Sequence, residues 1–245
     1  MGRRSSKIAT RKGAQDAQKA KRYGKIGKLI IQAVKAGGSD PQANTKLKEV
    51  LNQAKLVECP KDIIERNLKK ATDKSQEDFK EVTYEAYGPG GTGFVMECLT
   101  DNVNRSATDV RNAVTRTGGK MADPGSVLFN FQRQGLVFVA PSAGEDEVFE
   151  AAMDAGADDV QPVKGEEGCE GYKLLTSVED FVDVLKNVSS TGIPVDNEHS
   201  GLVYSPLTTV EVEDDILDQN ALLFERLLSV DDIDAVHTTC AGLQR

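Results

Sequence analysis

The sequence predicts an α+β protein with an N-terminal three-helix domain followed by two α/β (ferredoxin-like) domains, the third inserted into the second. Apolar residues recur at helical spacing as far as residue 71 and alternate with polar residues from residue 82 onward. The composition then becomes acidic, and residues 141–214 hold 18 acidic and three basic residues. One helix and one strand end the chain, and such a pair cannot bury its own apolar faces. We therefore expect the C-terminal pair to return to an earlier sheet.

The N-terminal domain, residues 1–78, is predicted from three apolar stripes. The first stripe runs from Ile26 to Val34 and ends at Gly37-Gly38, and the second covers Leu47 to Ala54. The third stripe follows Pro60, a residue suited to a first helical turn. Residues 1–22 have no such stripe, so we expect an arm, partly helical, that is mobile until it binds a partner.

The second domain is predicted to be discontinuous, with residues 79–140 and 210–245. Its expected elements are strands at 82–87 and 94–99 joined by the turn 88–91, a helix at 103–114, a hairpin of 127–131 with 136–140 around residues 132–135, a helix at 215–229 and a strand at 233–238.

The inserted domain, residues 141–209, is predicted from alternating helices and strands of the ferredoxin-like kind. Its expected elements are helices at 145–155 and 178–188 and strands at 158–163 and 172–176, followed by a strand at 207–212 that leads back to the second domain. Ser177 and Asp180 form a capping-box pattern ahead of the second helix.

Charge is divided very unevenly along the chain. The first 74 residues hold 19 basic and 7 acidic residues, a balance of +12, whereas the rest hold 11 basic and 32 acidic residues, a balance of −21. A basic lobe attracts a polyphosphate and an acidic lobe repels it. We therefore expect the N-terminal end to bind nucleic acid while the remainder points away.

The basic arm is the main candidate site. Its bases are interleaved with small polar residues, a pattern that favours contact with the phosphate backbone over base reading. An ordinary solvated tail is the alternative interpretation. The ten candidate contacts are Arg3, Arg4, Lys7, Arg11, Lys12, Lys19, Lys21, Arg22, Lys25 and Lys28.

A second contact surface is predicted from two further segments. The turn Gly88, Pro89, Gly90 and Gly91 lacks the Gly-Lys-Ser/Thr of a nucleotide loop, and a tight turn between strands is the alternative. The helix that opens near residue 102 offers donors at an N-terminus, where anions are favoured, and a helix cap with solvated side chains is the alternative. Its candidates are Asn102, Asn104, Arg105 and Arg111.

Catalytic and metal-binding patterns are absent from the sequence, so we expect no enzyme, no cofactor and no metal. His199 and His237 lack partners at ligand spacing and are interpreted as structural or solvated. The four cysteines are far apart, which favours reduced thiols over a disulfide framework or a zinc site. The opening formally matches a myristoylation pattern, but a basic arm that starts Met-Gly is the preferred interpretation.

The chain resembles the YebC/PmpR family, which includes the mitochondrial translational activator of cytochrome c oxidase. The resemblance covers nearly the whole chain. The matching stretches are residues 11–16 (RKGAQD), 37–41 (GGSDP), 60–66 (PKDIIER), 84–91 (YEAYGPGG), 99–105 (LTDNVNR), 125–127 (GSV) and the Pro-Leu at 206–207. The resemblance implies a helical N-terminal domain and two α/β domains, the third inserted in the second.

The resemblance also implies nucleic-acid work without catalysis. We expect a translation factor, or translational activator, that binds ribosomal RNA on the ribosome and assists elongation through difficult sequences such as proline runs. A DNA-binding transcriptional regulator acting on promoter DNA is the alternative. We expect a monomer, no membrane and no small-molecule substrate.

One departure from the family pattern lies at the N-terminus. The family usually opens Gly-His-Ser-Lys-Trp, whereas residues 2–7 here read GRRSSK, with more charge and without the aromatic residue. This opening is more similar to plant and algal members. We therefore expect a mitochondrial or chloroplast location, with a transit peptide absent from this chain, and the cytoplasm is the alternative.

Overall fold

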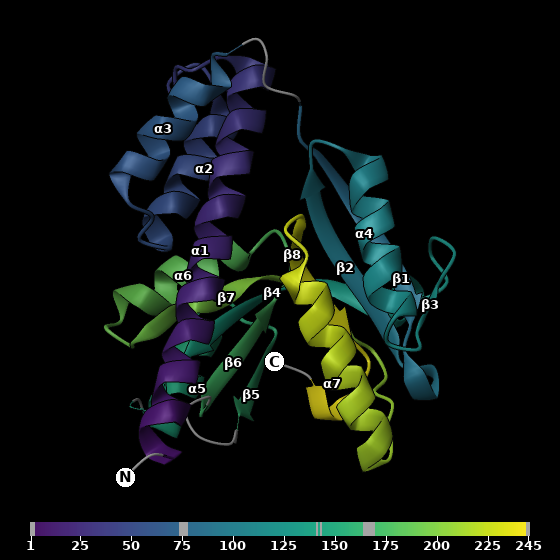
Figure 1. Cartoon of the computed structure of the whole chain (residues 1–245). Coiled ribbons are helices and arrows are strands. Elements are labelled where there is room, and N and C mark those ends of the chain that lie inside the picture. Colours follow the sequence, from purple (N-terminus) through teal and green to yellow (C-terminus); the bar gives the residue numbers. More distant parts are fainter. Residues whose placement is uncertain (1–2, 74–77, 141, 143, 164–169, 244–245) are drawn as a thin grey trace. The chain divides into compact units, whose positions relative to one another are not determined.

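The computed structural model describes residues 3–73, 78–140, 142, 144–163 and 170–243, with the side chains of all of these except residues 3–18 and 198. It forms two compact units, one of residues 1–124 with 212–236 and the other of residues 125–211 with 237–245. Helices come first, and a four-stranded sheet lies in each unit, which confirms the expected α+β class (Figure 1). None of the described helices combines the length and apolar character that a membrane span needs.

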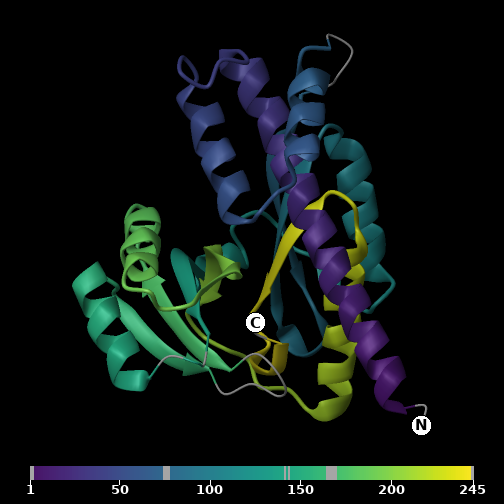
Figure 2. The same ribbon diagram turned by 90° about the vertical axis from the view of Figure 1, so that its left-hand side faces the viewer.

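Helix α1 (Arg3–Gly37) is 35 residues long and includes most of the segment that we expected to be an arm (Figure 2). Residues 3–22 contain no proline and are rich in Ala, Lys, Arg and Gln, which have high helix propensity. The helix therefore continues back through them, although the apolar stripe that identified it begins only at Ile26.

Helices α2 (Thr45–Leu56) and α3 (Lys61–Ala71) pack against the C-terminal half of α1. Ile30, Ile31, Leu47 and Ala54 are almost completely buried in this core. Buried Asn44 joins α1 to α2, because its amide donates to the carbonyls of Ala33 (2.7 Å) and Gly38 (2.8 Å) while its oxygen accepts from the first turn of α2. The predicted three-helix domain is thus present.

The first sheet has the order β3-β1-β2-β8. Strands β1 (Lys80–Tyr87) and β2 (Gly93–Thr100) are antiparallel partners joined by the short 3-10 turn η1 (Pro89–Gly91), and β3 (Lys120–Met121) extends one edge. Helices α4 (Val103–Thr115) and α7 (Asp214–Ser229) lie next to each other in this unit, and β8 (Ile233–Thr238) forms the other edge. The C-terminal helix and strand therefore return to the sheet of β1 and β2, as the sequence predicted.

The second sheet has the order β5-β6-β4-β7 and lies entirely in the second unit. Its strands are β4 (Phe131–Val139), β5 (Asp159–Val163), β6 (Gly171–Thr176) and β7 (Val195–Pro206). Helices α5 (Glu145–Ala155) and α6 (Phe181–Ser190) bury a core that includes Val137, Leu174 and Val184. Chain order and antiparallel pairing give the βαββαβ arrangement of a ferredoxin-like domain.

The expected hairpin at residues 127–140 is wrong. Residues 131–139 form the single strand β4, preceded by the short 3-10 turn η2 (Leu128–Asn130), and β4 pairs with β6 and β7 rather than with β1. The inserted sheet thus begins inside the segment assigned to the second domain. Gly135 suggested a turn, but a Cβ there would lie 2.7 Å from Phe181, so this glycine allows a helix to approach the strand closely.

The strand expected at 207–212 is also misplaced. The strand that leads back, β7, covers residues 195–206, and the expected segment 207–212 contributes an isolated bridge of Val210 with Cys240. The segment around Asp196 is polar and pairs with β4 across a register shift, so neither an apolar run nor strict alternation identified it.

Candidate nucleic-acid interface

The ten predicted bases divide into two groups along α1. Arg3, Arg4, Lys7, Arg11 and Lys12 lie in the helix, but their side chains are outside the described part of the chain, so their role stays a prediction. Of the other five, Lys19 is exposed, and Lys21, Arg22, Lys25 and Lys28 are half-buried. Two of these half-buried lysines, Lys21 and Lys28, have specific protein partners.

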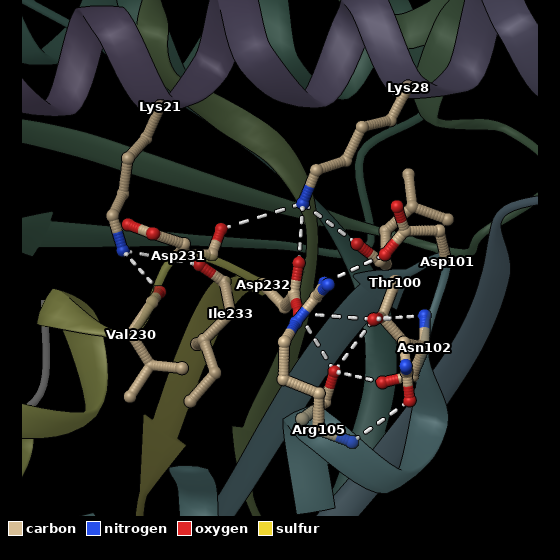
Figure 3. Close-up of polar contacts among 12 residues, drawn as sticks. Lys21, Lys28, Thr100, Asp101, Asn102, Arg105, Val230, Asp231, Asp232 and Ile233 are labelled. Atoms are coloured by element: carbon tan, nitrogen blue, oxygen red, sulfur yellow. Dashed lines mark hydrogen bonds and ion pairs between the residues drawn. The ribbon is translucent and has the colours of Figure 1, made fainter. Parts of the chain in front are cut away.

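Lys21 binds the turn between α7 and β8 (Figure 3). Its ammonium donates to the backbone carbonyls of Leu228, Val230 (3.1 Å) and Ile233 (3.3 Å). The last carbonyls of a helix lack intrahelical partners, and a cation there is favoured by the helix dipole. Burial lowers the pKa of Lys21, against the raising effects of Asp234 and Asp231. Lys21 thus completes the C-terminal end of α7.

Lys28 lies two turns further along the same face of α1. Its ammonium donates to the Leu99 carbonyl at 2.8 Å and lies 3.5 Å from the Asp232 carboxylate. It also lies 6.0 Å from the centre of the Phe79 ring, within the range of a cation–π contact. Lys28 therefore joins α1 to the ends of both β2 and β8.

Asp232 is the centre of the polar cluster. Its Oδ2 accepts from the Arg105 guanidinium at 2.7 Å, the Ser106 hydroxyl at 2.9 Å and the Thr100 hydroxyl at 3.0 Å. Burial raises the pKa of Asp232, but these hydrogen bonds together with the charge of Lys28 hold it below its ordinary value. The carboxylate is thus a fixed negative charge beneath α1.

The segment that opens α4 has a structural role. The Asn102 side-chain oxygen caps the helix by accepting from the backbone N–H of Arg105 at 3.0 Å. The backbone N–H of Asn102 donates to the Thr100 hydroxyl at 3.0 Å. The Arg105 side chain also bonds Asp101 at 2.7 Å. Asn104 and Arg111 are exposed on the same helix.

The two halves of the predicted second surface lie apart. The turn of residues 88–91 precedes β2 and Asn102 follows it, so the eight residues of the strand separate them. At about 3.3 Å per residue, this strand is about 25 Å long. The two segments are therefore not adjacent, and the predicted second surface is divided into two parts at opposite ends of β2.

The glycines of the 88–91 turn differ in what they allow. A Cβ on Gly88 would lie 2.4 Å from the buried Asn220 side chain, and one on Gly90 would lie 2.9 Å from Ile216. Asn220 holds the turn by donating to the Pro89 carbonyl at 3.0 Å. Only Gly91 in this turn has open space beside it, although its φ of +77° favours glycine.

Other exposed bases lie on the helical domain, where the sequence analysis did not single them out. They are Lys46, Lys48 and Lys55 on α2, and Lys61, Arg66, Lys69 and Lys70 on α3. Their signal was present in the charge balance of the first 74 residues, but no motif marked them. They extend the basic surface beyond α1.

A groove of about 790 Å³ lies between α4 and α7. Arg116 and Arg226 line it together with Arg105, but Asp109, Asp231 and Asp232 line it too. The mixed charge offers no clear preference for a phosphate.

The histidines and cysteines have structural surroundings. His199 bonds Asp196 at 2.7 Å, and His237 meets the Tyr204 ring edge-on at 5.5 Å. Cys59, Cys98 and Cys240 are free and buried, whereas Cys169 lies outside the described residues. Within the described part, no group of three His, Cys, Asp or Glu residues could hold a metal ion.

Comparison with known proteins covers almost the whole chain. A family model described as the TACO1/YebC protein N-terminal domain matches residues 3–74, and one described as the TACO1/YebC second and third domain matches residues 79–240. Both matches agree with a helical domain followed by two α/β domains.

Relatives from plants and bacteria are similar over most of their lengths. A probable transcriptional regulatory protein of Arabidopsis thaliana is 46% identical, over 97% of this chain and 74% of its own. Proteins with the same description from Chlamydia pneumoniae (40% identical, 93% of each chain) and Myxococcus xanthus (38% identical, 96% of this chain and 92% of that one) are also similar. The crystal structure of a conserved hypothetical protein from Aquifex aeolicus superimposes with a TM-score of 0.78 at 32% identity, covering 94% of this chain and 95% of that one.

Proposed function

Because this chain belongs to the TACO1/YebC family, we propose that it is a translation factor that binds ribosomal RNA on the ribosome and acts without catalysis. In this role it assists elongation through difficult sequences such as proline runs. The observation that carries the proposal is that the ten bases of the first 28 residues lie on one continuous helix, α1.

The shape of α1 supports binding to a phosphate backbone. At 1.5 Å per residue, the helix is about 50 Å long. At 100° per residue, positions 3, 7, 21, 25 and 28 fall within an arc of about 60°. Such a row of positive charges can follow a phosphate backbone and gain affinity by releasing counterions.

The charge of the rest of the chain supports one orientation. Residues 141–214, most of the second unit, hold 18 acidic and three basic residues, which a polyphosphate repels. The second unit would therefore face protein or solvent while the helical domain binds RNA.

A non-catalytic role is supported by the surroundings of the described thiols. Burial raises the pKa of Cys98 to about 11, and burial also raises the pKa of Cys59 and Cys240. The thiolate is the nucleophilic form, so these cysteines are poorly suited to covalent catalysis.

A DNA-binding transcriptional regulator is the second candidate, favoured by the names of the plant and bacterial relatives. Sequence-specific DNA readers place several base-reading side chains in the major groove. The Lys and Arg residues of α1 are interleaved with small residues. This pattern is better suited to contact with phosphates than to reading nucleobases, and it supports the RNA-binding proposal.

Crosslinking in native lysate separates the two candidates. The full chain is crosslinked and the bound RNA and DNA are sequenced, alongside the variant Lys7→Gln/Arg11→Gln/Lys12→Gln. A charge-matched control replaces Lys120, Lys173 and Lys186, which lie in the sheet domains. We expect ribosomal RNA to be enriched with the unchanged chain and the control, and to be lost with the α1 variant. Enrichment of promoter DNA without ribosomal RNA would show that the translation proposal is wrong.

Elongation assays test the role of the exposed turn. Gly91→Ala adds a methyl group into open space at a φ of +77°, and Gly38→Ala is a matched control at a φ of +87°, also in open space. We expect Gly91→Ala to retain ribosome affinity but to reduce synthesis through proline-rich reporters. Normal elongation with altered promoter occupancy would favour the DNA-binding regulator.

The remaining parts of the proposal concern location and assembly. We propose a mitochondrial or chloroplast location, on the basis of the basic opening, and a monomer. Imaging of the tagged chain in its own cells and light scattering of the purified protein test these two points.

A further inference from the structure

We infer that α1 is held against the first sheet by a lysine latch that competes with RNA for the same lysines. The latch comprises Lys21 and Lys28 on α1, which bind the backbone carbonyls of Val230 and Ile233 and the Asp232 carboxylate. Lys25, Asp231 and Asp234 add charge next to these contacts, at the turn before β8 and in its first residues. The inference rests on the proposed function and describes how its binding site is regulated.

The two sides of the latch are short segments of charged residues. Lys21, Lys25 and Lys28 follow i, i+4, i+7 on one line of the helix, with steps of about 6 and 4.5 Å. Asp232 lies in the turn directly before β8, and Asp234 is the second residue of that strand. Backbone carbonyls and the Asp232 carboxylate thus take up the ammonium groups of Lys21 and Lys28, which RNA phosphates would otherwise bind.

The contacts that Lys21 and Lys28 make with the first sheet and the turn before β8 are polar. Lys21 and Lys28 reach backbone carbonyls and Asp232, as Figure 3 shows. The apolar side of α1, with Ile30 and Ile31, is instead buried against α2 and α3. The helical domain can therefore leave the sheet without exposing the core of α1.

The pKa of Asp234 depends on the charged residues around the latch. Burial raises the pKa of its carboxyl, while Lys25, Lys28 and Lys21 oppose that rise and Glu97 on the neighbouring strand β2 adds to it. The charges of Asp234 and Asp231 raise the pKa of Lys21, against the lowering effect of burial. These charges surround the direct ion pair of the latch, between Lys28 and Asp232.

Electrostatic contacts of this kind are screened by salt and can be displaced by a polyanion. Exposed and half-exposed ion pairs contribute modestly to stability, whereas RNA offers many charges and releases its counterions. Only molecules with an open latch can bind RNA through these lysines, so the apparent affinity for RNA falls as the closed fraction rises. Weakening the acidic side of the latch should therefore tighten RNA binding.

The test compares two double variants with equal charge. Asp231→Asn/Asp232→Asn neutralises two latch carboxylates while keeping side-chain oxygens that can accept hydrogen bonds. The control Asp215→Asn/Asp218→Asn neutralises two exposed carboxylates of α7. Binding of a short oligouridylate is measured for both variants and for the unchanged chain. We expect the latch variant to bind about five-fold more tightly than the control, the change expected of modest charge contacts.

The outcomes distinguish the latch from the function. Equal or weaker binding by the latch variant than by the control overturns the latch and leaves the proposed function standing. Failure of the unchanged chain to bind RNA overturns both. If the double variant does not fold, as judged by thermal melting, Asp231→Asn against Asp218→Asn gives the same comparison, because Asp231 is exposed.

Hydrogen exchange gives an independent readout with the unchanged chain. Opening of the latch should increase amide exchange in residues 231–236 when the oligouridylate is added, because β8 is an edge strand. Exchange that stays the same or slows would overturn the inference.

Discussion

Arg105 and Asp232 lie 127 positions apart in the sequence and share a hydrogen bond of 2.7 Å. Arg105 belongs to the first turn of α4, and Asp232 precedes the last strand of the same sheet. The bond therefore ties the C-terminal segment to a helix that precedes the inserted domain in the sequence.

Removing the Asp232 carboxylate should destabilise the first unit. Asp232→Ala leaves Ser106 and Thr100, both buried, without an acceptor that they now use. Loss of buried hydrogen-bond partners costs about 2 kcal/mol. Urea denaturation should show this loss, whereas Asp101→Ala, which affects only a half-exposed pair with Arg105, should have a small effect. Equal effects of the two changes would contradict the central role of Asp232.

Two neighbouring acids should respond to pH with opposite sign. The pKa of Asp232 is lower in the folded chain, so its contribution to stability is present above the unfolded value of 3.8 and is lost as the pH falls through the folded value. The pKa of Asp234 is raised, so the folded state binds its proton more tightly and this acid favours folding as the pH falls toward 3.8.

The free energy of unfolding measured across the acidic range tests both signs. Asp232→Asn should weaken the loss of stability in acid, whereas Asp234→Asn should steepen it. The same direction of change in both variants would show that one of the two shifts is assigned wrongly.

The glycines of the 88–91 turn should differ in their effect on stability. Gly88→Ala places a methyl group 2.4 Å from Asn220 and 2.6 Å from Phe94, both fully buried, so one of them must move. Gly91→Ala meets no atom within 4 Å and costs only the strain of a positive φ, about 1 kcal/mol. Thermal melting should therefore drop clearly more for Gly88→Ala, and the reverse order would contradict the observed packing.

The C-terminal helix and strand should be indispensable to the first unit. A chain ending at Val210 lacks α7 and β8, so it loses the buried Asn220, Leu223 and Leu227 and leaves β2 as an open edge. Exposed apolar faces and open strand edges favour aggregation. We expect aggregates in size-exclusion chromatography. A monomer with unchanged melting would refute the discontinuous domain.

Elements with a clear apolar period were predictable from the sequence, and elements that depend on long-range partners were not. The stripe from Ile26 and the alternation from Val82 identified α1 and β1, and the unpaired C-terminal segment identified the return of β8. The N-terminal half of α1 has high helix propensity but no stripe, so its helix was only partly anticipated. Gly135 was misread because its close neighbour, Phe181, is 46 residues away in the sequence.

The candidate site shows the same division. The distribution of charge along the sequence indicated a basic N-terminal end, but it could not show which lysines have protein partners. Lys21 and Lys28 contact groups more than 70 residues away, and no local pattern announces such contacts. The strand that separates the two halves of the predicted second surface was predictable, and its length of eight residues keeps the halves apart.

The dependence of RNA affinity on salt tests the central claim most directly. Each phosphate contact adds about 0.7 to the slope of log affinity against log salt for a single strand, so replacing Lys7, Arg11 and Lys12 by Gln should flatten that slope by about two units. The charge-matched replacement of Lys120, Lys173 and Lys186 should leave the slope unchanged. We predict a flatter slope for the α1 variant alone, and an equal slope in all three proteins would show that the basic helix does not bind the RNA backbone.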